Sequence, residues 1–250
     1  MNRAERCDRS DPSGSLLRSL SRRLRPLTCA IGISLTTAWA ASEATQSVYR
    51  DDFRGDLRQW VVEQQFGGRV FVESGQLVIA DVAGATVWFR AELVAPVIIR
   101  YEVAVASTAR VSDLNCFWMA THPASPQDLF AGTRPCSGRF SDYDGLRTYY
   151  VGYGGNNNST TRFRRYDGTG ARPLAPEHDL RSPEFLLRPD HRYRIELRAL
   201  AGGRVQFLRD DQVIFDVVDP DPLTRGWFGF RTVNSRLEIS AFEVLKPTAD

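Results

Sequence analysis

The sequence predicts an all-β domain built as a β-sandwich of two antiparallel sheets. Apolar and polar residues alternate with a period of two along much of the chain, whereas helical periodicity is scarce. A period of two is typical of strands that bury one face. The alternating runs are short and are separated by Gly and Asp turns at fairly regular spacing, which is the pattern of an antiparallel sandwich.

The expected strands fall into three clear groups. Two alternating runs surround the turn Ser74-Gly75 within residues 70–79. Three further runs within residues 193–215, separated by a Gly-Gly and an Asp-Asp turn, predict a hairpin series. Val97 to Val105 is more continuously apolar, as expected for a strand inside a sheet.

Two long Pro-rich loops are predicted between the strands, at Pro123 to Ser141 and at Gly168 to Pro189. Loops on a rigid scaffold commonly carry binding and catalytic residues. We therefore expect these two loops to frame a binding face of the sandwich.

The first 40 residues are predicted to be a signal peptide and not part of the fold. Several arginines precede a mostly apolar run from Leu27 to Trp39, which ends in the cleavage site Ala38-Trp39-Ala40. The pair Arg22-Arg23 resembles the start of a twin-arginine signal, although Arg25 stands where such a signal is apolar. We expect a periplasmic or secreted protein with one domain over residues 41–250 and no membrane span after cleavage.

Bulk charge gives no reason to expect a nucleic-acid partner. The whole chain has a net charge of +2, of which the leader's seven arginines and three acidic residues supply +4, so residues 41–250 carry −2. A basic surface that attracts nucleic acid or anionic lipid is therefore not predicted.

Cys116 and Cys136 are the two cysteines that follow the leader. An even pair in an exported protein is compatible with a disulfide, and the alternative is two buried free thiols. No Cys or His spacing suggests a metal site, and no cofactor is expected.

The stretch from Thr148 to Gly168 is the most informative, because it joins Tyr, Gly, Asn and Arg residues with little aliphatic filler. If residues 160–166 form a strand, Arg162, Arg164 and Tyr166 share one face. Guanidinium groups bind carboxylates through two parallel hydrogen bonds, so an acidic sugar suits this strip. The structural alternative is a ladder of ion pairs with nearby acids, namely Asp142, Asp144 and Asp167.

Three tyrosines precede a turn at Gly154-Gly155. Tyr150 falls on the opposite side of the strand from Tyr149 and Tyr153, so one set packs while the other faces a cleft. A tyrosine beside arginines can serve as a general acid or base, and the alternative is that all three are packing aromatics. The following asparagines are predicted either to form a turn or to donate hydrogen bonds to a sugar; they are Asn156, Asn157 and Asn158.

A second polar cluster spans Asp113 to His122. Asp113 and Asn115 share one strand face and are predicted to hydrogen-bond a ligand. Trp118 is predicted to be a platform for a sugar ring, with a core Trp as the alternative. His122 stands at the end of the strand, where it is predicted to act as an acid or base or to be merely structural.

Motifs at both ends and in the middle of the chain resemble a known superfamily. Asp51-Asp52-Phe53 with Trp60, and Gly226 to Arg231 with Phe242-Glu243-Val244, resemble the opening and closing strands of concanavalin A-like lectin/glucanase domains. Residues 112–120, 149–156 and 162–166 resemble a bacterial domain-of-unknown-function family, number 6250, of that superfamily. The resemblance covers essentially residues 41–250. It implies a concanavalin A-like jelly-roll β-sandwich and an association with carbohydrate, and it carries no established catalytic residues.

These observations together predict a protein that acts on acidic, uronate-containing polysaccharide or oligosaccharide by β-elimination, as a polysaccharide lyase does. Arg162 and Arg164 would neutralise the uronate carboxylate with help from Asn156, and Tyr150 or His122 would exchange protons. The expected substrate-binding residues are Asp113, Asn115, Trp118, Tyr149, Tyr153, Asn157 and Tyr166.

Two other function classes remain open on the sequence. The first is a non-catalytic carbohydrate-binding module that uses the same Tyr, Trp, Arg and Asn residues. The second is a glycoside hydrolase built on Asp113 and a distant acid such as Asp142 or Glu177. The E-x-D-x-x-E arrangement of jelly-roll glucanases does not occur in the chain, which favours elimination over hydrolysis.

Overall fold

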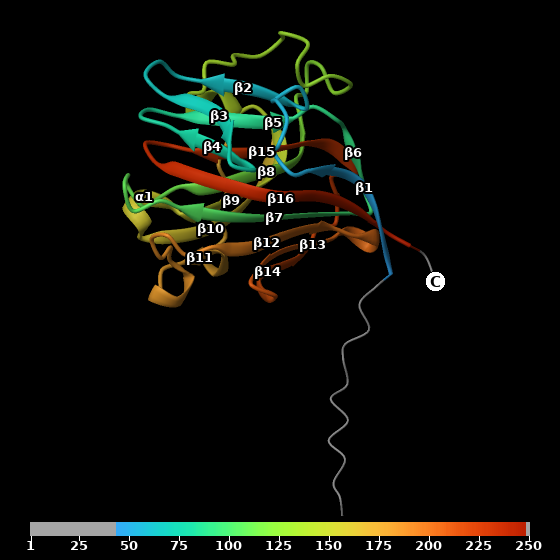
Figure 1. Cartoon of the computed structure of the whole chain (residues 1–250). Coiled ribbons are helices and arrows are strands. Elements are labelled where there is room, and N and C mark those ends of the chain that lie inside the picture. The colour runs from blue at the N-terminus through green and yellow to red at the C-terminus, as the bar shows by residue number, and fades with distance from the viewer. Residues whose placement is uncertain (1–43, 249–250) are drawn as a thin grey trace, which may run out of the picture. The chain divides into compact units, whose positions relative to one another are not determined.

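The computed structural model describes residues 44–248, so the predicted signal peptide over residues 1–40 lies outside the described part. Residues Ser42–Asp250 form one compact unit. Its described part contains two eight-stranded sheets packed face to face (Figure 1). Across residues 44–248, no helix has the length and apolarity that crossing a bilayer requires.

We call the first sheet sheet A. In spatial order, it contains β14 (Gln212–Val218), β13 (Arg204–Arg209), β12 (Tyr193–Ala199), β7 (Val97–Val105), β16 (Arg236–Pro247), β4 (Gln76–Ala80) and β3 (Arg69–Glu73). The eighth strand, β1 (Thr45–Asp51), pairs with the later part of β16. The first and last strands of the domain therefore lie side by side, as the blue and red arrows of Figure 1 show.

We call the second sheet sheet B. In spatial order, it contains β11 (Asp179–Leu180), β10 (Thr160–Asp167), β9 (Arg147–Gly154), β8 (Leu114–Thr121), β15 (Arg225–Thr232), β5 (Ala85–Phe89) and β2 (Trp60–Gln64). The short β6 (Leu93–Val94) pairs with the start of β15. Neighbouring strands in both sheets run antiparallel, which confirms the predicted fold class.

Within the described residues, helical structure is limited to single turns. They are α1 (Gly155–Asn158) and four 3₁₀ turns at Phe140–Tyr143, Pro176–His178, Pro183–Phe185 and Ala201–Gly203. The predicted hairpins at residues 70–79 and 193–215 are confirmed as β3–β4 and β12–β13–β14. Val97 to Val105 is an inner strand, because β7 lies between β12 and β16.

The main core lies between the sheets and is rich in aromatic side chains. Trp60 packs against Phe230 and Phe242, with ring centroids 5.3 and 4.9 Å apart. These three rings come from β2, β15 and β16, so they join the two sheets. Large buried aromatics contribute much of the apolar area that stabilises such a core.

A bulge interrupts the alternation of β8. The register with both neighbours shifts after Trp118, and Met119 has a φ of 54°. Met119 therefore points into the main core beside Trp118, while Ala120 points to the other face. Gly226 of β15 permits this close approach, since a Cβ there would lie 2.4 Å from the Met119 carbonyl carbon.

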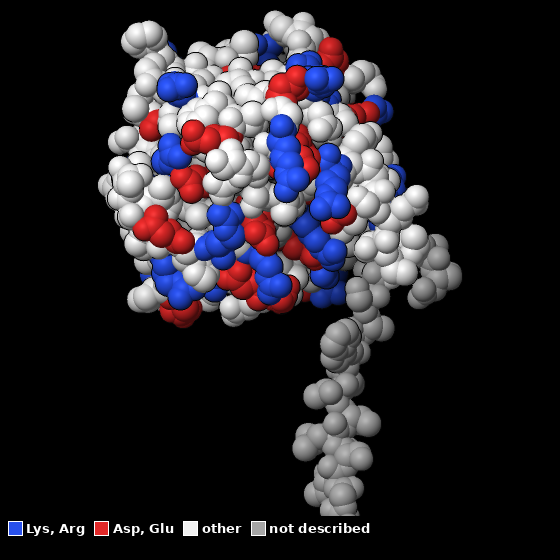
Figure 2. Space-filling model, viewed as in Figure 1, with Lys and Arg blue, Asp and Glu red and all other residues white. Residues whose placement is uncertain are grey.

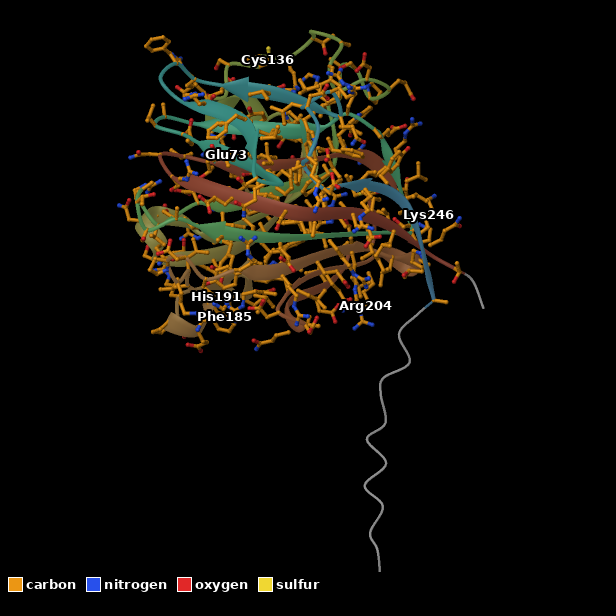
Figure 3. The ribbon with its side chains drawn as sticks, in the orientation of Figure 1. Glu73, Cys136, Phe185, His191, Arg204 and Lys246 are labelled. Atoms are coloured by element: carbon orange, nitrogen blue, oxygen red, sulfur yellow. The ribbon has the colours of Figure 1, made fainter. Side chains whose placement is uncertain are left out.

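The two cysteines of the described chain, Cys116 and Cys136, are free thiols and do not form the disulfide that the sequence left open. Cys116 is fully buried in the core between the sheets, on the opposite face of β8 from Asn115. Cys136 is exposed in the loop over the outer face of sheet B, at the top of Figure 3. Sheet B separates the two side chains, and the expectation that both free thiols would be buried is wrong for Cys136.

Candidate functional site

The outer face of sheet B carries side chains in transverse rows, because its strands are in register. One row holds Glu63, Thr86, Arg231, Asn115, Gly152, Arg162 and Asp179 from β2 to β11. The next row holds Val61, Trp88, Gly229, Phe117, Tyr150 and Arg164. Apart from its glycine, the first row is polar across the whole sheet, which is unusual for a face that is half covered.

The loop between β8 and β9, residues 122–146, covers the β2 half of this face. Beneath it lies a second apolar cluster that includes Trp88, Phe117 and Tyr143. Arg134 of the loop forms a buried ion pair with Glu63, at 2.5 and 3.1 Å, and both side chains are at most 4% exposed. The Tyr143 hydroxyl also donates to Glu63 at 2.9 Å. The loop is therefore fixed to the sheet by charge as well as by packing.

A pocket of about 250 Å³ remains on the other half of the face. Strands β8, β9 and β10 provide its floor, from Asn115, Tyr150, Gly152, Arg162 and Arg164. Its rim is formed by Asp113, Phe140, Gly155, Asn156, Thr160, Arg172 and Val233. Of the residues predicted from sequence, the structure thus brings together Tyr150, Arg162, Arg164, Asn156, Asp113 and Asn115.

Arg162 forms an ion pair with Asp179. Its Nε and Nη2 atoms lie 2.7 and 3.3 Å from the two carboxylate oxygens of Asp179 on β11. Arg162 lowers the pKa of Asp179 to about 2, and Arg181 contributes in the same direction. The ion-pair alternative is therefore what the structure shows for Arg162, although with Asp179 and not with the acids nearest in sequence.

Unlike Arg162, Arg164 forms no ion pair with a described carboxylate. Its Nη1 atom donates to the backbone carbonyls of Arg172 and Pro173, the latter at 3.2 Å. Within residues 44–248, no carboxylate pairs with Arg164, and its Nε and Nη2 atoms have no hydrogen-bond partner. The Nε–Nη2 edge of a guanidinium is well suited to bidentate binding of a carboxylate. Arg164 is thus held in place while one donor edge stays available.

Arg172 and Phe140 bridge the two long loops across the rim. Arg172 donates to both carboxylate oxygens of Asp144, at 2.6 and 2.7 Å. Its guanidinium lies 4.4 Å from the centre of the Phe140 ring, which is a cation–π contact. We call Asp144, Arg172 and Phe140 the clasp.

The charges of the pocket leave one positive charge unbalanced. Arg162 pairs with Asp179, Arg172 with Asp144, and Asp113 with Arg110. Arg164 is then the one lining residue of the described chain whose charge has no partner. The pocket is consequently complementary to a ligand with a single negative charge.

A second arginine, Arg231, lies next to Asn115 in the polar row of sheet B. Arg231 is fully buried, donates to Thr86 and to the Gly138 carbonyl, and has an Nε atom without a partner among the described residues. Its guanidinium lies 4.9 Å from the ring centres of both Phe140 and Tyr143. Burial lowers the pKa of Arg231, because a charge in an apolar setting loses hydration.

Tyr150 lies on the floor with its ring over Gly152. A Cβ at Gly152 would be 3.0 Å from the Tyr150 hydroxyl, so glycine provides the space for the phenol. The hydroxyl has no hydrogen-bond partner within residues 44–248. Burial raises the pKa of Tyr150 well above its usual range, and Tyr166 and Asp113 add to the rise. The phenol therefore stays protonated and suits the role of donor better than that of base.

Asn115 lines the pocket and carries a buried acceptor atom that is unsatisfied. It is 3% exposed, and its Oδ1 atom has no partner among the described residues. A buried amide oxygen without a hydrogen bond costs about 1–3 kcal/mol.

The three asparagines form the turn that the sequence allowed. Asn156, Asn157 and Asn158 all have left-handed φ values, of 53°, 58° and 57°. Such a conformation costs about 1–2 kcal/mol per residue for most L-residues, and Asn is among those that adopt it most readily. Asn156 lines the pocket, whereas Asn157 instead accepts from Arg110 at 2.6 Å. The strained turn therefore builds one wall of the pocket.

Five other predicted site residues lie elsewhere. Trp118, Tyr149 and Tyr153 are in the main core, so the predicted role of Trp118 as a sugar platform is wrong. Tyr166 shares the face of Arg164 as predicted but is fully buried in the second apolar cluster, next to Tyr150. His122 is seven residues beyond Asn115 along β8, which corresponds to roughly 20 Å at the rise of a strand. These residues cannot contact a ligand in the pocket.

Sequence reasoning missed Phe140, Arg172 and Gly152. The first two belong to the long loops that were expected to frame a binding face, but nothing local distinguishes them from their neighbours. Gly152 carries a usable signal, because a glycine inside an aromatic-rich strand often marks a close approach to another group.

The two packed sheets define a concanavalin A-like jelly-roll domain. Residues 79–242 match the family described as "Domain of unknown function (DUF6250)", and the chain belongs to this family, which confirms the resemblance seen in the sequence. No curated protein matches the chain.

Three solved structures illustrate the likeness in fold. A Bacillus subtilis protein of unknown function with a galectin-like fold is 19% identical, with a TM-score of 0.64 over 82% of this chain and 100% of that one. A carbohydrate-binding module, CBM66, from Bacillus subtilis is 11% identical, with a TM-score of 0.51 over 74% and 94%. The catalytic domain of a Thermotoga petrophila endo-1,3-beta-glucanase (laminarinase) is 11% identical, with a TM-score of 0.53 over 83% and 100%.

Proposed function

We propose that the pocket on sheet B binds an acidic sugar, and that the protein recognises uronate-containing polysaccharide outside the cytoplasm. The observation that carries this proposal is Arg164, which lines the pocket and whose Nε and Nη2 atoms have no described partner. Two proteins of similar fold are a carbohydrate-binding module and the catalytic domain of a laminarinase, which supports carbohydrate as the ligand class.

The charge balance supports a uronate over a neutral sugar. Three lining arginines face one lining acid, and the ion pairs around them leave one positive charge. A uronate unit carries one carboxylate, which the free edge of Arg164 can bind with two parallel hydrogen bonds. Asn115 and Asn156 would then bind the ring hydroxyls.

The aromatic residues also argue against a neutral-sugar module. Phe140 and Tyr150 are the aromatics that line the pocket within the described chain. Two guanidinium groups, those of Arg172 and Arg231, already lie over the Phe140 ring. Tyr150 is 6% exposed and packs against Phe117 and Tyr166. Neither ring is open enough to stack on a sugar, so recognition would depend on charge and hydrogen bonds.

A polysaccharide lyase is the second candidate, and the Tyr150 hydroxyl favours it. In β-elimination a base removes the proton at C5, the C4–O bond breaks, a C4–C5 double bond forms, and an acid protonates the leaving oxygen. The raised pKa of Tyr150 keeps the phenol protonated, which the acid role requires. Asp113 is the one acidic residue that lines the pocket within the described chain, so it is the candidate base.

The hydrolase alternative has less support. A retaining hydrolase needs two carboxyl groups about 5 Å apart. Asp142 accepts from the Ser137 amide and hydroxyl, at 2.7 and 2.6 Å, in the loop over the sheet. Glu177 is exposed in a turn. Neither acid lines the pocket with Asp113.

A single screen separates these functions. Purified protein is incubated with polygalacturonate, alginate and hyaluronan, with laminarin as the neutral comparison, and binding, reducing ends and ultraviolet absorbance are followed. Binding of an acidic polymer without new reducing ends would identify a binding module. New absorbance that disappears in Tyr150→Phe, while binding survives, would identify a lyase. Equal binding of laminarin, or no binding of any acidic polymer, would contradict the proposal.

A further inference from the structure

We infer that the pocket accepts the terminal unit of a glycan chain and excludes interior units. This inference rests on the proposed function, since it concerns the ligand of the same pocket. It follows from how the neighbouring side chains close the outer face of sheet B around the pocket.

The clasp closes the pocket between the two long loops. Asp144 belongs to loop 122–146, and Arg172 belongs to the loop between β10 and β11. Their bidentate ion pair, together with the cation–π contact of Arg172 with Phe140, joins the loops over the row that contains Tyr150 and Arg164. A further contact holds Arg172 down, because Arg164 donates to its carbonyl.

Beyond the clasp, packed apolar side chains cover the outer face of sheet B. Tyr150 packs against Phe117 and Tyr166, with ring centroids 4.9 and 5.9 Å apart, and Leu146 lies in the same buried cluster. Tyr166 and Leu146 are fully buried. A glycan in the pocket would meet packed side chains here and not a continuing groove.

Ion pairs fix the elements on the two lateral sides of the pocket. Toward β2, the buried Glu63–Arg134 pair holds loop 122–146 on the sheet. Toward β11, Asp179 binds Arg162 on one side and Arg181 on the other, at 2.7 Å in both pairs. The remaining rim is formed by Asp113, before β8, by Val233, after β15, and by Gly155, Asn156 and Thr160 at the β9–β10 connection.

The size of the pocket agrees with a terminal ligand. Its volume of about 250 Å³ lies below the roughly 300–1,000 Å³ of common small-molecule sites. A polymer bound through an interior unit must enter and leave the site at two ends. A pocket with one open rim admits a chain end, and the free edge of Arg164 would then bind the carboxylate of the terminal unit.

The inference can be tested through stoichiometry. Oligogalacturonates of defined length, from the disaccharide to long oligomers, are titrated into the full mature protein by calorimetry, with the corresponding alginate series alongside. We expect one protein per chain at every length and an affinity per chain that does not rise with length. A protein-to-chain ratio that grows with length would overturn chain-end binding while leaving the proposed function intact. If no oligomer of either series binds, the proposed function fails, and this inference fails with it.

An Asp144→Ala variant tests whether the clasp is what excludes interior units of a glycan from the pocket. Asp144 does not line the pocket, and its loss removes the ion pair that holds Arg172. We expect the ratio on long oligomers to rise above one per chain in this variant. Asp211→Ala, which removes the partner of Arg194 on sheet A, is the matched control and should keep the wild-type ratio. A ratio of one in Asp144→Ala would overturn the clasp as the element that excludes interior units.

Discussion

The outer faces of the two sheets are both rich in charge, yet they differ in how that charge is used. On sheet A, arginines and acids alternate and pair: Arg100 and Arg198 with Glu196, and Arg194 with Asp211. Figure 2 shows basic and acidic side chains interspersed in the view of Figure 1, without a large area of one sign. On sheet B, half of the face is covered by a loop, and the open half retains an arginine without a described carboxylate partner.

This difference shows that pocket size alone does not identify a site. The hollow on sheet A, at about 460 Å³, is larger than the pocket on sheet B, but all of the arginines that line it are paired with acids. Exposed ion pairs contribute about 0–1 kcal/mol each and are typical of a solvated surface. A partly buried guanidinium with an open donor edge, beside an unsatisfied buried amide, is the feature that points to a ligand.

The largest expected effect concerns the loop that covers sheet B. Glu63→Ala leaves Arg134 buried without its partner and removes the acceptor of Tyr143. Breaking a buried ion pair from one side costs about 3–5 kcal/mol, so the free energy of unfolding in urea should fall by that amount.

The matched change on sheet A is Glu238→Ala. Its pair with Arg236 is about 27–29% exposed, and we expect a loss of at most about 1 kcal/mol. Similar losses for the two variants would show that the loop is not anchored by the buried pair.

The next effect concerns the pocket itself. Arg164→Ala removes the available donor edge and should weaken uronate binding by about 1.5–3 kcal/mol, or roughly 10- to 100-fold, without loss of fold. Arg164→Lys should restore binding partly, because an ammonium group cannot reproduce the planar fork. Titration calorimetry measures both.

Arg194→Ala makes the same change of charge on sheet A, where the arginine is 63% exposed and paired with Asp211. We expect its uronate affinity to equal that of the wild type. An equal loss in Arg194→Ala would mean that general charge, and not the pocket, attracts the ligand.

The contrast between the faces also explains what the sequence could and could not predict. Side chains alternate between the two faces of a strand, and this alternation is a local property of the chain. It therefore correctly predicted that Arg162 and Arg164 share one face of the strand. It also correctly separated Tyr150 from Tyr149 and Tyr153. The pairing of Arg162 with Asp179 and the cover over Tyr166 depend on where the long loops fold back, which local pattern does not encode. The bulge at Met119 interrupts the alternation of side chains along β8, and local pattern does not encode it either.

A smaller effect is expected from filling the floor of the pocket. Gly152→Ala places a methyl group 3.0–3.3 Å from three atoms of Tyr150. Overpacking typically costs about 1–3 kcal/mol, and the lower end applies here because the hydroxyl end of the ring can shift into the open pocket. We expect uronate affinity to fall by up to about tenfold, or 1.4 kcal/mol.

Gly55→Ala is the matched control, since nothing lies within 4 Å of its added methyl group. It should change neither binding nor thermal stability. Unchanged affinity in Gly152→Ala would show that the floor near Tyr150 does not contact the ligand.

The smallest expected effect is a dependence of stability on pH. Arg162 lowers the pKa of Asp179 from 3.8 to about 2, so the pair stabilises the fold fully above pH 3.8 and loses this contribution as the pH falls toward 2. Because the pair is partly exposed, the difference in unfolding free energy between wild type and Asp179→Asn should be at most about 1 kcal/mol at neutral pH, and it should vanish below pH 2.

Asp56→Asn is the comparison for this titration. Arg58 also lowers the pKa of Asp56 to about 2, but that pair is exposed and is weakened by salt. A larger pH-dependent loss in Asp56→Asn than in Asp179→Asn would contradict the view that β11 is fixed to sheet B by the Arg162 pair.

The central claim is that the pocket on sheet B recognises the carboxylate of a sugar. The most direct measurement is a calorimetric titration of the mature protein with a uronate oligosaccharide and with its methyl ester, which keeps the rings and removes the charge. We expect the acid to bind and the ester to bind at least about tenfold more weakly, in proportion to the lost charged hydrogen bonds of Arg164. Equal affinity for the acid and the ester would contradict the claim.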